Sequence, residues 1–184
     1  MPHARLPAPG SLPQTQVLPR SGSAQFAASM KKLWAGVVAG SVRRALPAFF
    51  PRAAYLQVKA IADASLDWEV RLVHDFALDL AAAHALLGSR ASKARLVRVL
   101  VPPALAHWVP PGACYNAVGY YEVPNARVVY RADGETRSFG IASMISWRGQ
   151  WYVVHMGVVQ RSVDSGVVDE AAVGPGSSAA ASTC

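Results

Sequence analysis

One cysteine and one histidine are the residues of this chain best suited to covalent chemistry. Cys114 lies in the stretch GACYNAVGYY and His155 in WYVVHMG, and a Cys/His pair is a common arrangement of a nucleophile and its base. Asn116 or Ser146 could orient the pair. A lone cysteine is more commonly an inert buried thiol, and a disulfide from Cys114 to Cys184 would need an oxidising compartment. All three states of Cys114 stay open.

The remaining polar residues show no spacing typical of a metal or phosphate site. The histidines are His3, His74, His84, His107 and His155. None of them forms an HxxxH pair, and the sequence has no CxxC motif. No glycine-rich loop follows a predicted strand. We therefore expect neither a metal nor another cofactor. Arg71, Asp75 and Asp79 are predicted on the outer face of a helix, where Asp75 pairs with Arg71 as an ordinary surface ion pair.

The clearest structural pattern lies between Ala126 and Gly157. Asp133-Gly134 and Arg148-Gly149 separate runs rich in β-branched and aromatic residues, as two-residue hairpin turns do. These turns predict a meander of three antiparallel strands and fix its register. The predicted cross-strand pairs are Trp147 with Gln150, Ile145 with Tyr152, Ser143 with Val154, and Ile141 with Met156.

The opposite face of this meander is too apolar to be left in water. It carries Val129, Gly140, Ala142, Met144, Ser146, Trp151, Val153 and His155. We expect helices to cover one face of the sheet and a partner chain to be able to cover the other. An apolar outer face of this kind would make the protein a structural or accessory homodimer.

One long helix and two further strands complete the predicted fold. The helix runs from Asp67 to Leu87, with a strand at Arg95 to Val101 and another near Val118 to Val123. A proline-rich loop that contains His107, Trp108 and Cys114 joins these two strands. The inward helix positions are predicted to be Leu66, Val70, Val73, Phe76 or Ala77, Leu80, His84 and Leu87. The fold class is α+β, with a curved antiparallel sheet of about five strands on one long amphipathic helix, as a cone or roll.

The two ends of the chain have the composition of disordered tails. Residues 1–29 form a proline-rich basic leader, residues 162–184 are rich in small residues, and residues 30–161 form the single domain. Residues Met30 to Val42 imitate a signal sequence, although a short amphipathic helix with Leu33, Val37, Val38 and Leu46 inward fits them better. We favour the cytoplasm over export.

The charge of the chain is concentrated at its start. The net charge is +7, yet the first 62 residues hold eight Lys or Arg and no acidic residue, so the remainder is nearly neutral. A sequence-specific nucleic-acid surface on the sheet is therefore not expected. Any contact with a membrane would have to come from the basic N-terminal arm.

Two stretches resemble a known architecture. Leu66 to Leu87 followed by Ile141 to Met156 is similar to the cystatin-type cone of ketosteroid-isomerase-like and nuclear-transport-factor-like domains. Phe49 to Gly157 also resembles proteins of high-GC Gram-positive bacteria that have no assigned activity. The first resemblance implies a cone with a concave pocket. It implies no activity, because one long helix stands where the cone has three and no residue matches its catalytic set.

These observations favour a binding module for a small apolar or aromatic ligand or a peptide. The residues predicted to form its pocket are Trp108, Tyr115, Met144, Trp151, Val153 and His155. The alternatives are the homodimeric interaction protein and a hydrolase-type enzyme that uses Cys114 as nucleophile and His155 as base.

Overall fold

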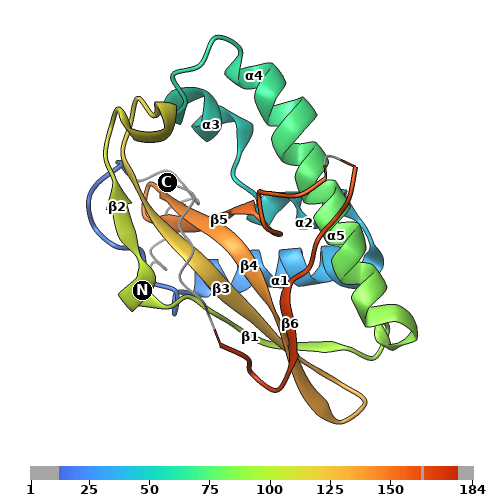
Figure 1. Ribbon diagram of the computed structural model, residues 1–184. Coiled ribbons are helices and arrows are strands. Elements are labelled where there is room, and N and C mark those ends of the chain that lie inside the picture. The colour runs from blue at the N-terminus through green and yellow to red at the C-terminus, as the bar shows by residue number, and fades with distance from the viewer. Residues whose placement is uncertain (1–12, 163, 178–184) are drawn as a thin grey trace, which may run out of the picture.

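The chain folds as an α+β domain in which helices pack against an open antiparallel sheet (Figure 1). The computed structural model describes residues 13–162 and 164–177. The helices are α1 (Ala24–Ala39), α2 (Val42–Ala45), α3 (Arg52–Val58), α4 (Ala64–Asp67) and α5 (His74–Leu87). A π-helical stretch, η2 (Trp68–Val73), joins α4 to α5, and 3₁₀ turns lie at η1 (Leu46–Ala48), η3 (Gly88–Arg90), η4 (Pro103–Leu105) and η5 (Ala113–Tyr115). The strands are β1 (Arg95–Leu100), β2 (His107–Val109), β3 (Tyr120–Ala132), β4 (Glu135–Trp147), β5 (Gln150–His155) and β6 (Asp169–Val173).

The predicted meander is present as β3, β4 and β5. Both hairpins turn on two residues with positive φ, Asp133-Gly134 and Arg148-Gly149, as the sequence pattern indicates. The pairs of Trp147 with Gln150 and Ile145 with Tyr152 are confirmed. The predicted pair of Ser143 with Val154 is wrong, because a β-bulge leaves Val154 unpaired.

The bulge changes the face on which the end of β5 points. Ser143 pairs with His155, while the next residue of β4, Met144, pairs with Val153. One extra residue on β5 shifts the alternation of its side chains by one position. His155 therefore leaves the face of Val153, where the regular pattern had placed it, and joins the face of Ser143.

The sheet has six strands where about five were predicted. The strand predicted near Val118 to Val123 and the first strand of the meander are one strand, β3, and two further strands lie in segments predicted to be irregular. β2 pairs with β3 inside the proline-rich loop, and β6 pairs with β4. The prediction of a disordered segment from residue 162 is therefore wrong for Asp169–Val173. Residues 163 and 178–184 lie outside the described residues.

The N-terminal segment also contributes to the fold. The prediction that residues 1–29 are disordered is wrong for residues 13–29, and residues 1–12 lie outside the described residues. The Gln14 side chain donates to the Gly119 carbonyl at 2.8 Å and accepts from the Arg148 amide at 2.7 Å. The Trp151 indole donates to the Pro19 carbonyl at 3.0 Å. These bonds hold the segment against the sheet.

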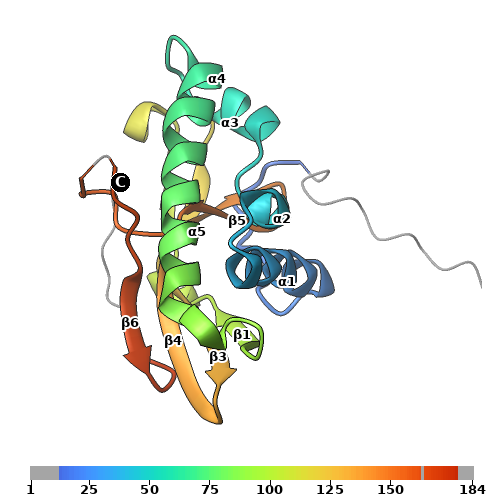
Figure 2. The ribbon, with the colours of Figure 1, turned by 90° about the vertical axis from the view of Figure 1, so that its right-hand side faces the viewer.

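Helix α1 covers one face of the sheet and lies behind it in Figure 1; Figure 2 shows the same layer edge on. Ser23 caps its start by accepting from the Phe26 amide, and Gly40 ends it with a φ of 58°. Leu33 and Val37 are buried, as the amphipathic pattern predicts. No helix within the described residues is both long and apolar enough to span a membrane.

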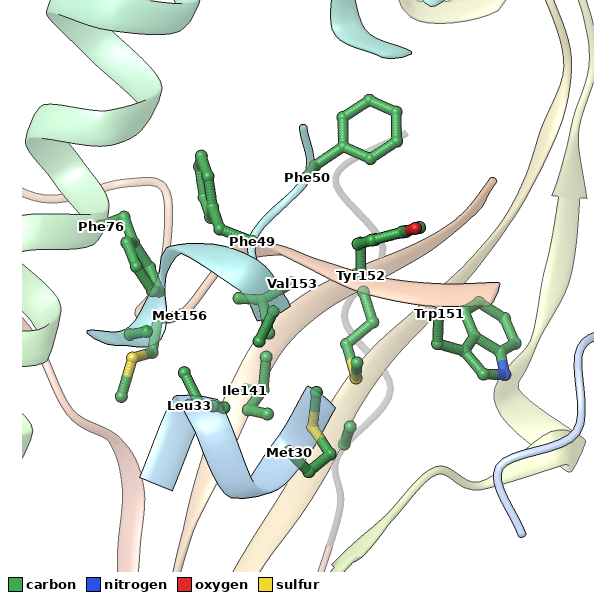
Figure 3. Packing of buried hydrophobic residues seen from close by; sticks show 14 of the residues in the cluster. Met30, Leu33, Phe49, Phe50, Phe76, Ile141, Trp151, Tyr152, Val153 and Met156 are labelled. Atoms are coloured by element: carbon green, nitrogen blue, oxygen red, sulfur yellow. The ribbon is translucent and has the colours of Figure 1, made fainter. Parts of the chain in front are cut away.

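The main core lies between α1, α5 and the sheet. Figure 3 shows Met30 and Leu33 of α1 close to Ile141 and Val153 of the sheet. Met144 and Val153 are completely buried there, and Trp151 is 3% exposed. The apolar face that carries Met144 and Val153 is therefore covered by a helix of the same chain. The homodimer hypothesis stays a prediction.

The long helix runs without a break through α4, η2 and α5, and this element of the prediction is confirmed. Its inward face is only partly as predicted. Phe76, Leu80 and Leu87 are buried, but Leu66 and Val70 are 53% and 58% exposed. The wider π-helical turns of η2 break the 3.6-residue period on which the prediction relied.

Candidate functional site

A cavity of about 290 Å³ lies on the face of the sheet opposite α1, between the sheet, α3 and η2. Its apolar wall includes Phe50, Val58, Leu72, Ile145 and Val154. Its polar lining comprises Tyr55, Lys59, Arg71, Tyr120, Glu122, Ser143 and His155, with Cys114 and Tyr115 at the rim. Such a mixture of an apolar wall and a few converging polar groups is typical of small-molecule sites.

Two residues reach the cavity from η2. Arg71 and Leu72 both line it, and both belong to the π-helical stretch. Trp68, at the start of the stretch, donates its indole N–H to the Phe50 carbonyl at 2.8 Å and ties the helix to the segment before α3. π-Helical turns are rare and occur frequently at functional sites.

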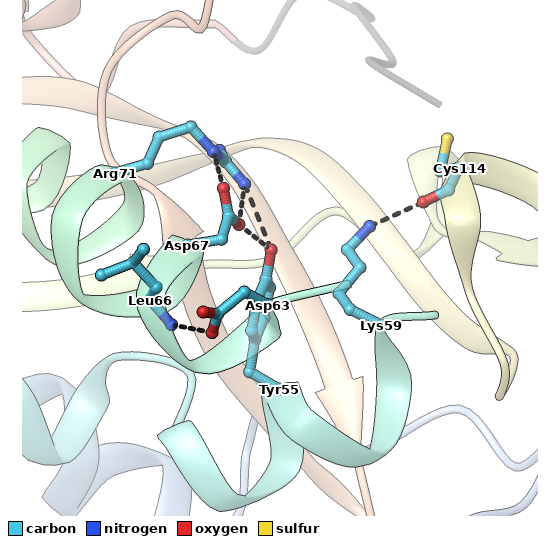
Figure 4. Close-up of polar contacts among 7 residues, drawn as sticks. All are labelled: Tyr55, Lys59, Asp63, Leu66, Asp67, Arg71 and Cys114. Carbon is cyan, nitrogen blue, oxygen red and sulfur yellow. Dashed lines mark hydrogen bonds and ion pairs between the residues drawn. The ribbon is translucent and has the colours of Figure 1, made fainter. Parts of the chain in front are cut away.

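A polar cluster of Tyr55, Asp67 and Arg71 closes one side of the cavity (Figure 4). The Arg71 guanidinium donates to both carboxylate oxygens of Asp67 at 2.7 and 2.6 Å, and to the Tyr55 hydroxyl at 3.1 Å. The Tyr55 hydroxyl in turn donates to Asp67. The Arg71 hydrogen bond holds the pKa of Asp67 below its usual value, while burial raises that of Tyr55. The charge of Arg71 is thus already matched by a carboxylate.

Lys59, just after α3, crosses the cavity toward the η5 loop (Figure 4). Its ammonium donates to the Cys114 backbone carbonyl at 2.8 Å. No carboxylate of the described residues lies within ion-pair distance of its Nζ. Burial, followed by the charge of Arg71, lowers the pKa of Lys59. Within residues 13–162 and 164–177, this partly buried cation therefore has one hydrogen bond, which goes to a neutral acceptor.

Glu122 forms the polar floor of the cavity from β3. Its side chain is 3% exposed and accepts from the Ser143 hydroxyl at 2.9 Å. The His107 Nε2 lies 3.3 Å from its other carboxylate oxygen. Strands β2, β3 and β4 therefore hold this carboxylate from two sides.

His155 enters the cavity because of the β-bulge in β5. Its pKa is lowered to about 4, mainly by burial and also by the charges of Arg71, Arg161 and Lys59, while Asp75 opposes them. Its imidazole is consequently neutral at pH 7. The charges of Arg71, Arg161 and Lys59 therefore oppose protonation of His155, and the charge of Asp75 favours it.

The rim of the cavity is the turn that contains Cys114 and Tyr115. Both residues have positive φ, 51° and 56°, which is uncommon outside glycine. The turn is held by the Lys59 side chain and by the Ala60 amide, which donates to the Tyr115 carbonyl at 2.8 Å. Tyr115 is 76% exposed. Cys114 is disulfide-bonded, so in this form it offers no thiolate; Cys184 lies outside the described residues.

The structure brings two of the six predicted pocket residues, Tyr115 and His155, into this cavity. Met144 and Val153 point to the opposite face, and Trp151 lines a separate depression of about 220 Å³ beside α1. Trp108 packs against Tyr121 at a ring distance of 5.3 Å. These four residues do not line this cavity, and their role in ligand binding stays a prediction.

Sequence reasoning missed Lys59, Arg71 and Glu122 as cavity residues. Glu122 had a usable signal, because it is the single acidic residue in the apolar run from Val118 to Val123. A charge within a buried strand commonly has a specific partner. Lys59 and Arg71 had no such signal, since their places depend on the path of α3 and on the π-helical turns.

Among the described residues, no group of three or more histidine, cysteine, aspartate or glutamate side chains could hold a metal ion. No family model, curated protein or solved structure proved similar to this chain. The resemblance to the cystatin-type cone therefore stays a prediction.

Proposed function

We propose that this protein binds a small apolar or aromatic molecule in the cavity between the sheet, α3 and η2. The single observation that carries this proposal is the convergence of α3, η2, the η5 turn and the sheet on one cavity with an apolar wall and a few fixed polar groups. Its volume of about 290 Å³ is near the lower end of the range for ligand pockets, so the ligand is a compact molecule and not a peptide.

Two features support binding over covalent catalysis. Cys114 is disulfide-bonded, which removes the thiolate that a cysteine hydrolase would need. The Arg71 guanidinium binds both carboxylate oxygens of Asp67 and the Tyr55 hydroxyl, so its charge is matched within the wall of the cavity. The neutral imidazole of His155 then acts as a hydrogen-bonding group for the ligand.

A cone-like curvature of the sheet is part of this proposal. Register shifts between Leu96 and Arg98 on β1 and between Ser143 and Met144 on β4 support it, because β-bulges bend and twist a sheet. Asn125, with a φ of 54° inside β3, is a third irregular point. The cavity would lie on the concave side of such a sheet.

A cavity-filling substitution tests the proposal. Val154→Phe places an aromatic ring in the cavity, whereas Val97→Phe adds the same ring at an exposed position of β1. The probes are the neutral aromatics indole, benzyl alcohol and phenylacetamide, at millimolar concentration, observed by ligand-detected NMR. We expect binding of at least one probe to the wild type and to Val97→Phe, and its loss in Val154→Phe. Equal binding to all three proteins, or none to the wild type, would refute the proposal.

A further inference from the structure

We propose that the ligand of this cavity is a monocarboxylate whose charge pairs with the ammonium of Lys59 and whose apolar body lies against Phe50, Val58 and Ile145. This inference rests on the proposed function and names the ligand class for the same site. The observation behind it is that Lys59 has no carboxylate partner within the described residues.

The other cations around the cavity differ from Lys59 in this respect. Arg71 binds both oxygens of Asp67, and Arg161 pairs with Asp79 and Asp75. An ammonium has three N–H donors, and the structure gives Lys59 one acceptor, the Cys114 carbonyl. Taking a charge partly out of water is unfavourable unless an opposite charge compensates it. A bound carboxylate would supply that charge and a second acceptor.

The location of the charges fixes which end of the cavity takes the carboxylate. Lys59 and His155 line the cavity together, and burial and the charge of Arg71 lower the pKa of Lys59 by more than Asp67 and Glu122 raise it. The carboxylate of Glu122 is already held by Ser143 and His107. The anion therefore lies on the Lys59 side, where the neutral imidazole of His155 can donate one hydrogen bond to it.

The ligand carries one charge and not two. The guanidinium of Arg71 is already matched by Asp67, so Lys59 alone has charge left to offer. A dianion such as phosphate would bury a second charge against a wall that is mostly apolar. The desolvation of that second charge costs more free energy than its attraction to Lys59 supplies. Inorganic phosphate is accordingly a discriminating probe.

The test compares two probes of the same shape, phenylacetate and phenylacetamide, by calorimetric titration of the non-reduced full chain at pH 7. We expect phenylacetate to bind about tenfold to hundredfold more tightly, as for a hydrogen bond between charged groups. Lys59→Met should equalise the two affinities, and Lys59→Arg should keep the preference. Lys93→Met removes a lysine from an exposed turn and should change neither affinity.

The outcomes separate this inference from the proposed function. If phenylacetamide binds as tightly as phenylacetate and Val154→Phe abolishes both, the cavity binds ligands but the charge assignment is wrong. Tighter binding of inorganic phosphate than of phenylacetate would also overturn it. If neither aromatic probe binds, or if Val154→Phe weakens neither, the proposed function itself fails. A thermal unfolding curve for each variant confirms that it is folded.

Discussion

Two cations flank the long helix, and their surroundings differ sharply. Arg161 pairs with Asp79 and lies 3.5 Å from Asp75. Asp79, 1% exposed, also accepts from the Gly157 amide at 2.7 Å and from the Val167 amide at 2.9 Å. Lys59, on the cavity side, donates to one backbone carbonyl and has no carboxylate in reach within the described residues.

This difference distinguishes a structural ion pair from a site that is open to a ligand. Burial raises the pKa of Asp79, and the bonds from Val167, Gly157 and Arg161 oppose that rise. Both carboxylate oxygens of Asp79 accept hydrogen bonds, which is the condition under which a buried charge stabilises a fold. The cavity leaves one charge unmatched beside an apolar wall. A partly buried charge without an opposite charge lowers the stability of a fold, and charges of this kind are found preferentially at functional sites.

The largest expected effect comes from removing the carboxylate of the matched pair. Asp79→Ala leaves the buried guanidinium of Arg161 without its main partner and two backbone N–H groups without acceptors. We expect a loss of about 3–5 kcal/mol in the free energy of unfolding, measured by urea denaturation. Asp75→Ala is the matched control, since Asp75 is more exposed, and should cost about 1 kcal/mol or less. Equal losses for the two variants would contradict the comparison.

His155 should make stability depend on pH on the cavity side of the helix. Its pKa is about 4 in the folded chain against 6.5 in the unfolded one, so the unfolded state binds the proton first as pH falls. Stability should be complete above pH 6.5 and decrease toward pH 4, by up to about 3 kcal/mol.

The matched experiment measures the free energy of unfolding of the wild type and of His155→Gln at several pH values. Their difference isolates the histidine from the carboxylates, which titrate in both proteins. We expect the wild type to lose stability relative to the variant between pH 6.5 and pH 4. A constant difference across that window would show that His155 is not shielded from water.

The sequence predicts the elements around the Arg161–Asp79 ion pair better than it predicts the cavity around Lys59. The hairpins follow from local signals, because Asp133-Gly134 and Arg148-Gly149 supply the positive φ values that the turns require. The helix follows from its apolar period. Asp79 was nevertheless placed on an outer face, because the segment that covers it, around Gly157 and Val167, has the composition of a tail.

The cavity depends on irregularities that a periodic pattern does not contain. A bulge at Val154 turns His155 to the cavity face, and the π-helical turns of η2 bring Arg71 and Leu72 to the wall. Each is a one-residue departure from regular geometry. A prediction built on periods of two and 3.6 residues therefore finds the long helix and the hairpins but does not find the residues that line this cavity.

The smallest expected change in stability separates the two cations directly. Lys59→Met removes one hydrogen bond to a carbonyl and also the cost of a partly buried charge, so the free energy of unfolding should change by about 1 kcal/mol or less. Arg161→Met should lower the free energy of unfolding several times more, because it leaves the buried carboxylate of Asp79 without its cation. Both variants replace a cation with the same apolar side chain, and urea denaturation at pH 7 compares them. If Lys59→Met destabilised the protein as much as Arg161→Met, the main role of Lys59 would be structural, through its hydrogen bond to the Cys114 carbonyl. Its charge would then no longer indicate an anionic ligand.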